Sequence, residues 1–263
     1  NNTGAADISQ KNAVKISDME SGEGFDRIGL GLLGDQMKLL KAVRATGKPL
    51  VLVMIQGRPL DLNWAAENVP AIINAWYPGQ EGGTGIADVL FGDYNPAGRL
   101  TVSIPKSVGQ LPVYYNYKRP VRRAYVEMES TPLYPFGFGL SYSTFSYDKL
   151  TAGLVEAADD FKVDVKVAVT NTSNVAGDEV VQLYVRDDYS SVVTPDRQLK
   201  KYARVHFNGK QQQTVSFTLT KEDLKLLGAD MKWKTEAGRF TILVGGSSAD
   251  IKLQESLELK KDY

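Results

Sequence analysis

The sequence contains no cysteine and a single histidine, His206, among its 263 residues. Without cysteine the chain can form no disulfide framework, no thiolate metal site and no cysteine nucleophile. One histidine also rules out a histidine-rich zinc site, although carboxylates could still bind Ca²⁺ or Mg²⁺. Thiol and histidine-based metal chemistry are therefore excluded as the basis of its function.

The sequence also lacks an excess of charge of either sign, because 31 lysines and arginines balance 31 acidic residues. Nucleic-acid-binding proteins usually show a basic excess, so we expect no nucleic-acid partner. No apolar run approaches the roughly 20 residues that span a bilayer, and we expect no membrane partner. A hydrophobic content of 43% is ordinary for a globular protein, and the length suggests two domains.

The first part of the chain alternates between helix and strand signals. Asp35 is a plausible N-cap and Gly47 a plausible residue just past a helix end. The predicted elements are a helix over 36–46, a strand over 50–55, a short helix over 64–69, a strand over 71–76 and a helix ending at 92. The unbroken apolar run at 50–55 predicts a strand buried on both faces, as in a parallel sheet. Sites in open α/β sheets lie off the carboxyl ends of the strands, here the loops 56–59 and 78–83.

The middle and last parts of the chain differ in composition and in their pattern of apolar residues. Residues 95–140 hold repeated prolines and a tyrosine cluster, which predict an extended connector that wraps the first domain. After about residue 145 apolar and polar residues alternate, which predicts half-buried strands around 161–169, 181–185, 215–219 and 240–244. One helical turn is expected at 221–224. Regular short strands with turns between them are typical of a β-sandwich of the immunoglobulin or fibronectin kind.

The predicted fold class is an open, mostly parallel α/β sheet sandwich followed by an all-β fibronectin III-like or immunoglobulin-like sandwich. We place the α/β sandwich domain at residues 1–110. An extended connector rich in proline and tyrosine follows at 111–145, and the β-sandwich covers 146–263.

Several separated strings give the chain a family resemblance. They are GEGFDR at 22–27, GKPLVLV at 47–53, GRPL at 57–60, AWYPGQEGG at 75–83, ADVLFGDYNPAGRL at 87–100, LPVYYN at 111–116 and LYPFGFGLSYSTF at 133–145. Each string alone is weak, but their order and spacing together are specific. The chain resembles the family-3 glycoside hydrolases, the β-glucosidase group, and its tail resembles that family's fibronectin III-like domain.

The resemblance implies a third domain. Family members place a (β/α)₈-type barrel, which carries the catalytic aspartate nucleophile, before the α/β domain. This chain has no room for a barrel of about 250 residues. We therefore expect it to be the C-terminal portion of an enzyme whose barrel comes from the same precursor or from another chain in trans. The sugar-contacting groups would come mostly from that barrel, so the sequence assigns no substrate-binding residue.

The resemblance also assigns one catalytic residue. Retaining glycosidases need two carboxyl groups, a nucleophile and a general acid/base, whose environments separate their pKa values. In the family the acid/base is a glutamate on a loop of the α/β domain, which by motif is Glu23. Gly22 and Gly24 on either side allow a tight turn that presents the side chain. Glu20, three residues earlier, is the alternative. The mechanism implies no metal and no organic cofactor.

Other conspicuous residues have plainer interpretations. Ser17-Asp18 imitates the family's nucleophile motif but lacks the barrel context. Glu81 could reach the site, but a glutamate in such a turn more often hydrogen-bonds the turn's own backbone. Trp76 and Tyr77 could stack on a sugar, although Trp76 ends an apolar strand and is expected to pack in the core. His206 is expected to be structural. The basic residues Lys118-Arg119 and Arg122-Arg123 are expected to form a solvated face.

The sequence thus predicts part of a retaining β-glycosidase acting on β-glucosides, with β-xylosides or other β-linked sugars as alternatives. A non-catalytic carbohydrate-binding or interaction module is the alternative from another class, because β-sandwiches often only pack or bind. By resemblance to bacterial relatives we expect a periplasmic or secreted protein, and a homodimer is possible.

Overall fold

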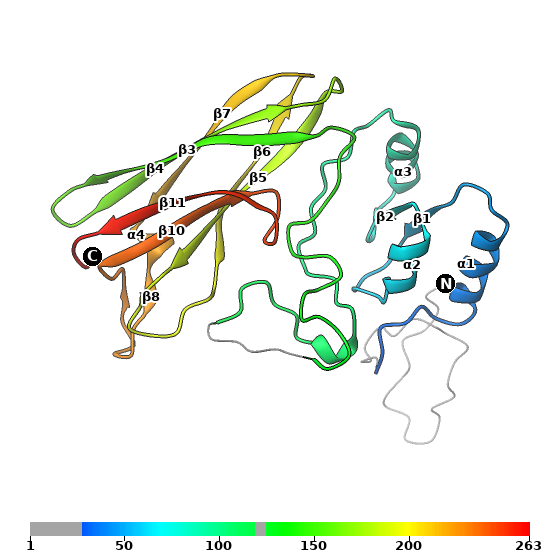
Figure 1. The fold of residues 1–263 in the computed structure, drawn as a ribbon, viewed down its shortest axis with the longest axis horizontal. Helices are drawn as coiled ribbons and strands as arrows, with labels where there is room; N and C mark the ends of the chain where they lie inside the picture. Colours follow the sequence, from blue (N-terminus) through cyan, green and yellow to red (C-terminus); the bar gives the residue numbers. More distant parts are fainter. Residues whose placement is uncertain (1–27, 119–124) are drawn as a thin grey trace. The chain divides into compact units, whose positions relative to one another are not determined.

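The computed structural model describes residues 28–118 and 125–263, which divide into two compact units. The first unit holds residues 28–79 and 104–111 of the described chain, and the second holds the remainder. Figure 1 shows the elements of both units. The predicted fold class is confirmed: a small α/β part with parallel strands precedes a β-sandwich. The domain boundaries at 110 and 145 stay predictions.

The first unit pairs two parallel strands with two helices. Its elements are α1 (Gln36–Ala45), β1 (Val51–Met54), α2 (Asn63–Asn68), β2 (Ala71–Asn74) and the short 3₁₀ helix η1 (Val108–Gln110). Asp35 occupies the N-cap position of α1 and Gly47 follows its end with φ of 71°, both as predicted. Leu40, Ala65 and Val69 form the buried core of this unit.

One prediction for this unit is wrong. The strand at 50–55 was expected to be buried on both faces, but Val51 is 43% and Ile55 64% exposed. The reason is that β1 has only β2 as a paired neighbour among the described residues, so one edge and much of one face are uncovered. A parallel strand is buried on both faces only where further strands and helices surround it.

The second unit begins with helix α3 (Gly82–Phe91), which ends at Gly92 with φ of 87°. The sandwich that follows contains seven long strands and a small hairpin. The strands are β3 (Phe145–Glu156), β4 (Phe161–Asn171), β5 (Gly177–Asp187), β6 (Gln198–Phe207), β7 (Gln212–Thr220), β8 (Leu226–Leu227), β9 (Trp233–Lys234), β10 (Gly238–Gly245) and β11 (Ile251–Leu259), and the helix α4 (Lys221–Leu224) lies between β7 and β8. The one-turn helix α4 lies where the sequence predicts it, fixed by a capping box between Thr220 and Asp223.

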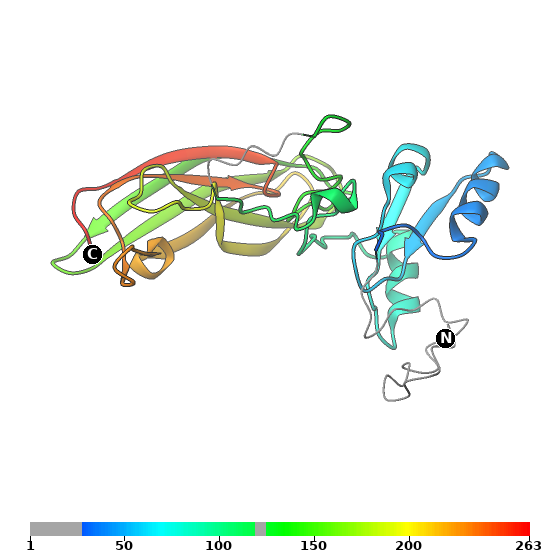
Figure 2. The same ribbon diagram turned by 90° about the horizontal axis from the view of Figure 1, so that it is seen from below.

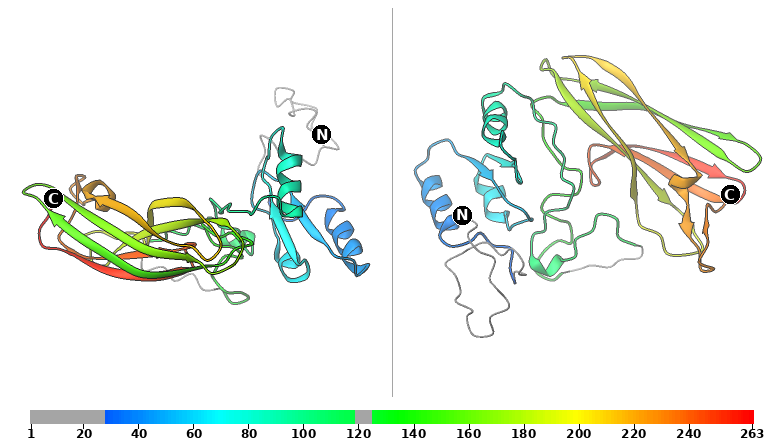
Figure 3. Two further views of the ribbon diagram at one scale, coloured as in Figure 1. Left: turned by 90° about the horizontal axis from the view of Figure 1, so that it is seen from above. Right: turned by 180° about the vertical axis from the view of Figure 1, so that it is seen from behind.

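The long strands form two antiparallel sheets with the orders β11-β10-β5-β6 and β3-β4-β7. Alternate residues of β4, from Phe161 to Val169, are almost fully buried between them, as the period of two predicts. Residues of β5, β6, β7, α4, β10 and β11 complete the core, and burying each large apolar side chain stabilises the fold by about 1.5–3 kcal/mol. The turn between β3 and β4 lies at the same end as the C-terminus (Figure 1, Figure 2 and Figure 3).

The expected connector is divided between the two units: residues 104–111 belong to the first, and its other described residues belong to the second. That it wraps the first domain stays a prediction. Tyr115 stacks on Phe136 with ring centroids 4.1 Å apart and meets Tyr184 of β5 edge-on. Tyr184 lies between the core residues Leu183 and Val185, so it points to the outer face of its sheet, yet it is fully buried. Tyr115 and Phe136 therefore cover part of the outer face of the β-sandwich, because their aromatic rings find an apolar partner there.

Candidate functional site

The predicted acid/base, Glu23, lies outside the described residues, as do Glu20 and Ser17-Asp18. Its assignment stays a prediction. Of the basic residues Lys118-Arg119 and Arg122-Arg123, only Lys118 lies within the described residues. The described site residues are those at the carboxyl ends of the parallel strands.

The carboxyl ends of β1 and β2 meet at one edge of the first unit. The two strands pair in parallel with Met54 opposite Asn74, so the residues that follow them are neighbours. Two backbone hydrogen bonds prolong the pairing, from Ala75 N to Met54 O at 2.9 Å and from Gln56 N to Trp76 O at 3.3 Å. This is the edge at which open α/β sheets build their sites, as the sequence predicts for the loop 56–59.

A buried pair of amides occupies this edge. Gln56 is 5% exposed, and its Nε2 donates to Asn74 Oδ1 at 3.2 Å. The other two amide atoms, Gln56 Oε1 and Asn74 Nδ2, are buried without a hydrogen-bond partner. Exchanging oxygen and nitrogen in both amides still leaves one acceptor and one donor group unpaired. Each such group costs about 1–3 kcal/mol, so the pair marks a place where an additional polar group is favoured.

Two aromatic residues follow the second strand. Trp76 adopts the left-handed backbone conformation with φ of 51°, which is rare outside glycine and clusters at functional sites. Trp76 is half-buried and lies outside the apolar cluster of this unit, so its expected core packing is wrong. Because of the positive φ, the Trp76 side chain does not continue the alternation of side chains between the two faces of β2. Tyr77 is 79% exposed.

The tyrosine ring of Tyr77 lies directly against the backbone of the neighbouring loop. A Cβ at Gly57 would clash with the Tyr77 ring, so a side chain there would require this exposed ring to move. The edge therefore combines neutral amides with an exposed aromatic ring, a set suited to binding an uncharged polar molecule. Among these residues there is no carboxylate, so the edge alone supplies no acid/base or nucleophile.

Glu81 does not take its expected role. It occupies the N-cap position of α3, but its exposed side chain makes no capping hydrogen bond. Glutamate is one methylene too long for the usual N-cap bond to the second or third N–H of a helix, which aspartate and serine reach.

His206 lies on β6 of the sandwich, where it contacts an acidic residue, and its structural role stays a prediction. Its Nδ1 lies 2.7 Å from Asp178 Oδ1, and Arg204 Nε donates to Asp178 Oδ2 at 2.6 Å. Burial would raise the pKa of Asp178, but hydrogen bonds from His206 and Arg204 outweigh it and hold the pKa below its usual value.

Several family strings have a structural role inside the second unit. Arg99 forms an ion pair with Glu179 of β5 at 2.8 Å, and both side chains are at most 10% exposed. Tyr147 donates to the other Glu179 oxygen at 2.7 Å. Burial raises the pKa of Glu179 and, with the Glu179 charge, that of Tyr147. These strings join the segment after α3 to the sandwich, rather than forming a reaction centre.

In the described part of the chain, no group of three or more histidine or acidic residues is arranged to hold a metal ion. No helix there is long and apolar enough to cross a membrane. The amide pair was missed at the sequence level, although a polar residue directly after each apolar run, Gln56 and Asn74, is a usable signal.

Comparison with known families gives two matches. Residues 5–142 match the glycosyl hydrolase family 3 C-terminal domain, and residues 179–248 match the fibronectin type III-like domain. A β-xylosidase from Formosa agariphila is 46% identical over 253 residues, which cover 94% of this chain and 35% of that protein. A periplasmic β-glucosidase from Salmonella typhimurium is 42% identical over 248 residues, covering 90% of this chain and 32% of that protein.

Solved structures show the same relationship. A β-glucosidase from Erythrobacter marinus is 43% identical with a TM-score of 0.85, covering 89% of this chain and 31% of that one. A β-glucosidase from Listeria innocua, solved in complex with isofagomine, is 34% identical with a TM-score of 0.83. The match covers 88% of this chain and 34% of that one. The chain thus spans about a third of the length of these relatives.

Proposed function

This chain belongs to glycoside hydrolase family 3, and from that premise we propose that it is the acid/base-bearing part of a retaining β-glycosidase. The observation that carries the proposal is the family match over residues 5–142, which includes Glu23 and the strand edge with Gln56 and Asn74. Relatives named β-glucosidase and β-xylosidase support glycoside hydrolysis as the reaction.

The proposed reaction proceeds in two displacements. The Glu23 carboxylic acid gives its proton to the glycosidic oxygen while a nucleophilic carboxylate forms a bond to the anomeric carbon. The leaving alcohol departs, and the bond to the enzyme replaces the glycosidic bond. Glu23, now ionised, takes a proton from water, whose oxygen attacks the same carbon and releases the nucleophile. Both steps invert the anomeric carbon, so the product keeps the β configuration.

The nucleophile would come from a barrel domain, supplied by the same precursor or by another chain. The proposal is supported by the share of the relatives that this chain spans, about a third. It is also supported by chemistry: a retaining enzyme needs two carboxyl groups roughly 5–5.5 Å apart. The residues described at the strand edge, Gln56, Asn74, Trp76 and Tyr77, include no carboxyl group.

β-Glucosides are the proposed substrates, and β-xylosides are the second candidate. Glucosides fit the relatives from Salmonella and Listeria, whereas the Formosa relative is named a β-xylosidase. We also propose a periplasmic or secreted location, supported by the relative named a periplasmic β-glucosidase.

Proton NMR during hydrolysis tests the reaction. We expect the protein to hydrolyse 4-nitrophenyl β-glucoside and to release the β-anomer first, before mutarotation produces the α-anomer. A parallel assay with 4-nitrophenyl β-xyloside compares kcat/KM for the two sugars, and we expect the glucoside to be preferred. First release of the α-anomer would exclude a retaining mechanism. Inertness toward both substrates of the full-length protein, assayed together with its barrel domain, would exclude the β-glycosidase proposal.

A further inference from the structure

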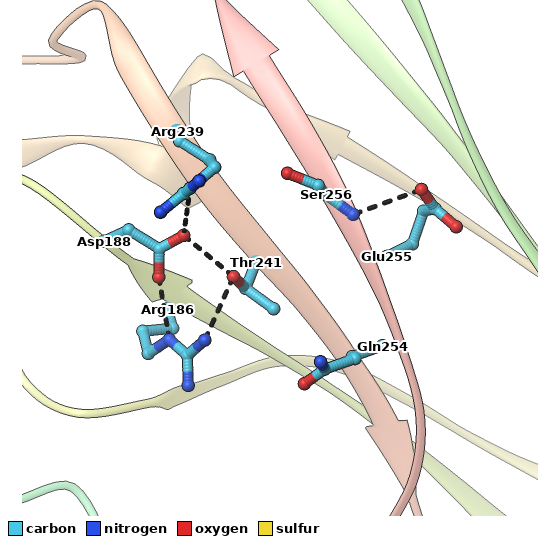
Figure 4. A pocket seen from close by; sticks show the side chains of 7 residues that line it. All are labelled: Arg186, Asp188, Arg239, Thr241, Gln254, Glu255 and Ser256. Carbon is cyan, nitrogen blue, oxygen red and sulfur yellow. Dashed lines mark hydrogen bonds and ion pairs between the residues drawn. The ribbon is translucent and has the colours of Figure 1, made fainter.

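A polar depression lies on the outer face of the sandwich sheet that contains β5, β10 and β11 (Figure 4). Its floor is a row of three residues, one from each strand. Arg186 of β5 pairs in register with Thr241 of β10, which pairs with Ser256 of β11, so the three side chains share one face. The depression has a volume of about 270 Å³ and is also lined by Asp188, Arg239 and Gln254.

One side of the depression is held rigid by a carboxylate between two guanidinium groups. Asp188 accepts from Arg186 Nε at 2.8 Å and from Arg239 Nε at 3.1 Å, and Thr241 Oγ1 donates to it at 2.9 Å. Burial would raise the pKa of Asp188, but these hydrogen bonds outweigh it, so the pKa is lowered and the group stays ionised. The side chains are therefore ordered before any ligand arrives, which reduces the entropy lost on binding.

The charges in the depression cancel. Arg186 and Arg239 contribute two positive charges, while Asp188 and Glu255 contribute two negative ones. An anionic or cationic ligand would therefore gain no net attraction. Hydrogen-bonding capacity nevertheless remains, because the exposed side chains of Gln254 and Ser256 offer both donors and acceptors. Alternating donors and acceptors with no net charge suit the hydroxyl groups of a neutral sugar.

An exposed aromatic residue stands beside the depression. Tyr189 is 71% exposed, and the Arg239 guanidinium carbon lies 5.4 Å from the centre of its ring. The loop that carries Tyr189 is held in place two residues later, where Ser191 N donates to Glu236 at 2.8 Å. The ring is thus presented next to the polar depression on an anchored loop, rather than packed in the core. Rigid aromatic rings beside polar groups supply contact area at low entropic cost.

We propose that this depression is a carbohydrate-binding subsite that holds one residue of a neutral oligosaccharide, with Tyr189 as its stacking surface. The volume lies just below the roughly 300–1,000 Å³ of pockets for drug-sized ligands, which suits a single sugar ring. The site is open to solvent on the sheet surface, so a longer chain can continue past it. It would hold substrate chains on the sandwich independently of hydrolysis.

Isothermal titration of the protein with cellohexaose and xylohexaose tests the proposal through a filling substitution. Ser256 is exposed, so Ser256→Trp fills the depression without removing a core contact. Ser216→Trp is the matched control, because Ser216 is an exposed serine on β7 of the other sheet. We expect Ser256→Trp to lower the affinity for at least one oligosaccharide by about tenfold or more, and Ser216→Trp to leave it unchanged. Equal affinities in the two variants would overturn the proposal, even if the catalytic centre also binds the sugar.

A second pair of variants tests the stacking surface. Tyr189→Ala should lower the affinity by about fivefold to tenfold. Tyr202→Ala is the control and should change nothing, because Tyr202 has similar exposure on β6, whereas Tyr189 packs on the lining residue Arg239. Tighter binding of oligogalacturonate than of the neutral chains would contradict the charge argument and overturn the assignment. Hydrolysis of 4-nitrophenyl glycosides should be unchanged in all four variants, so these results are independent of the proposed reaction.

Discussion

At the scale of single residues, the strand edge of the first unit stands out for its buried amides. Gln56 and Asn74 make one hydrogen bond between them and leave two buried amide atoms unpaired. Such groups are rare in folded proteins because each one costs free energy. Beside them, Trp76 holds a strained backbone conformation. Both features are tolerated where they serve a site, and their place at the carboxyl ends of parallel strands agrees with that interpretation.

A second residue-scale feature gives a pH-dependent prediction. Glu236 accepts from Ser191 N and Ser191 Oγ and pairs with Lys234 Nζ at 2.9 Å. Burial opposes ionisation, but the Ser191 and Lys234 interactions outweigh it and lower the pKa of Glu236 from 4.5 to about 2. Because the folded-state pKa is depressed, this carboxylate stabilises the fold above pH 4.5, and the stabilisation is lost as the pH falls toward 2.

Urea unfolding between pH 2 and pH 7 measures this effect. We expect Glu236→Gln to lower the free energy of unfolding at pH 7. The difference in free energy of unfolding between the variant and the native protein should become smaller as the pH falls below 4.5. Glu258→Gln, at an exposed position of β11, serves as the control. A Glu236→Gln deficit that stays constant over the whole pH range would show that the carboxylate charge does not contribute.

At the scale of elements, a buried ion pair joins the segment after α3 to the sandwich. Arg99 pairs with Glu179 of β5, and Tyr147 of β3 completes the hydrogen bonding of the carboxylate. Leu100 N donates to Phe138 O at 2.8 Å, and Gly137 N donates to Leu100 O at 2.7 Å, so the same segment is fixed by its backbone. Two of the strings that carry the family resemblance, those with Arg99 and with Phe136 to Gly139, thus meet here.

Removing one partner of this pair should be costly. Arg99→Met leaves Glu179 buried without its counter-charge, and we expect a loss of about 3–5 kcal/mol in the free energy of unfolding at pH 7. Arg99→Met combined with Glu179→Gln removes the buried charge and should recover part of that loss. Urea denaturation of the single and double variants measures both values. A loss below about 1 kcal/mol in the single variant would mean that the pair is solvated in solution.

Local patterns identify most elements of this chain but not their surroundings. The alternation from Phe161 to Val169 predicts β4, and Thr220 with Asp223 marks the start of α4. The apolar run at 50–55 predicts a strand but not its exposure, which depends on neighbours that the pattern does not name. The packing of Tyr115 on the sandwich is not predicted from the sequence for a similar reason: its partners Phe136 and Tyr184 are distant in sequence.

The two candidate sites differ in how much of each can be predicted from the sequence. Glu23 is assigned by a short motif and needs no tertiary contact to be noticed. The depression on the sandwich could not be predicted, because Arg186, Thr241 and Ser256 become neighbours only through strand register. Register is set by long-range pairing, and a slip of one residue would move every side chain to the other face.

At the scale of the whole molecule, the proposed function assigns to this chain one of the two carboxyl groups that the reaction requires. Its zero formal charge fits a neutral sugar substrate, which needs no electrostatic steering. The family membership, the names of the relatives and the third of their length that this chain spans support a division of roles. In that division the α/β domain brings the acid/base, a barrel brings the nucleophile, and the sandwich holds the substrate chain.

Chemical rescue of a Glu23 variant tests this account most directly. Glu23→Gln in the full-length protein should lower kcat/KM for 4-nitrophenyl β-glucoside by about 10²–10⁴, the usual contribution of a general acid/base. Turnover of a 2,4-dinitrophenyl glucoside, whose leaving group needs no proton, should be limited by deglycosylation, and added azide should restore it with β-glucosyl azide as product. Glu20→Gln is the matched control and should retain activity. Full activity of Glu23→Gln on the poorly activated substrate, or azide rescue in Glu20→Gln instead, would contradict the assignment of Glu23.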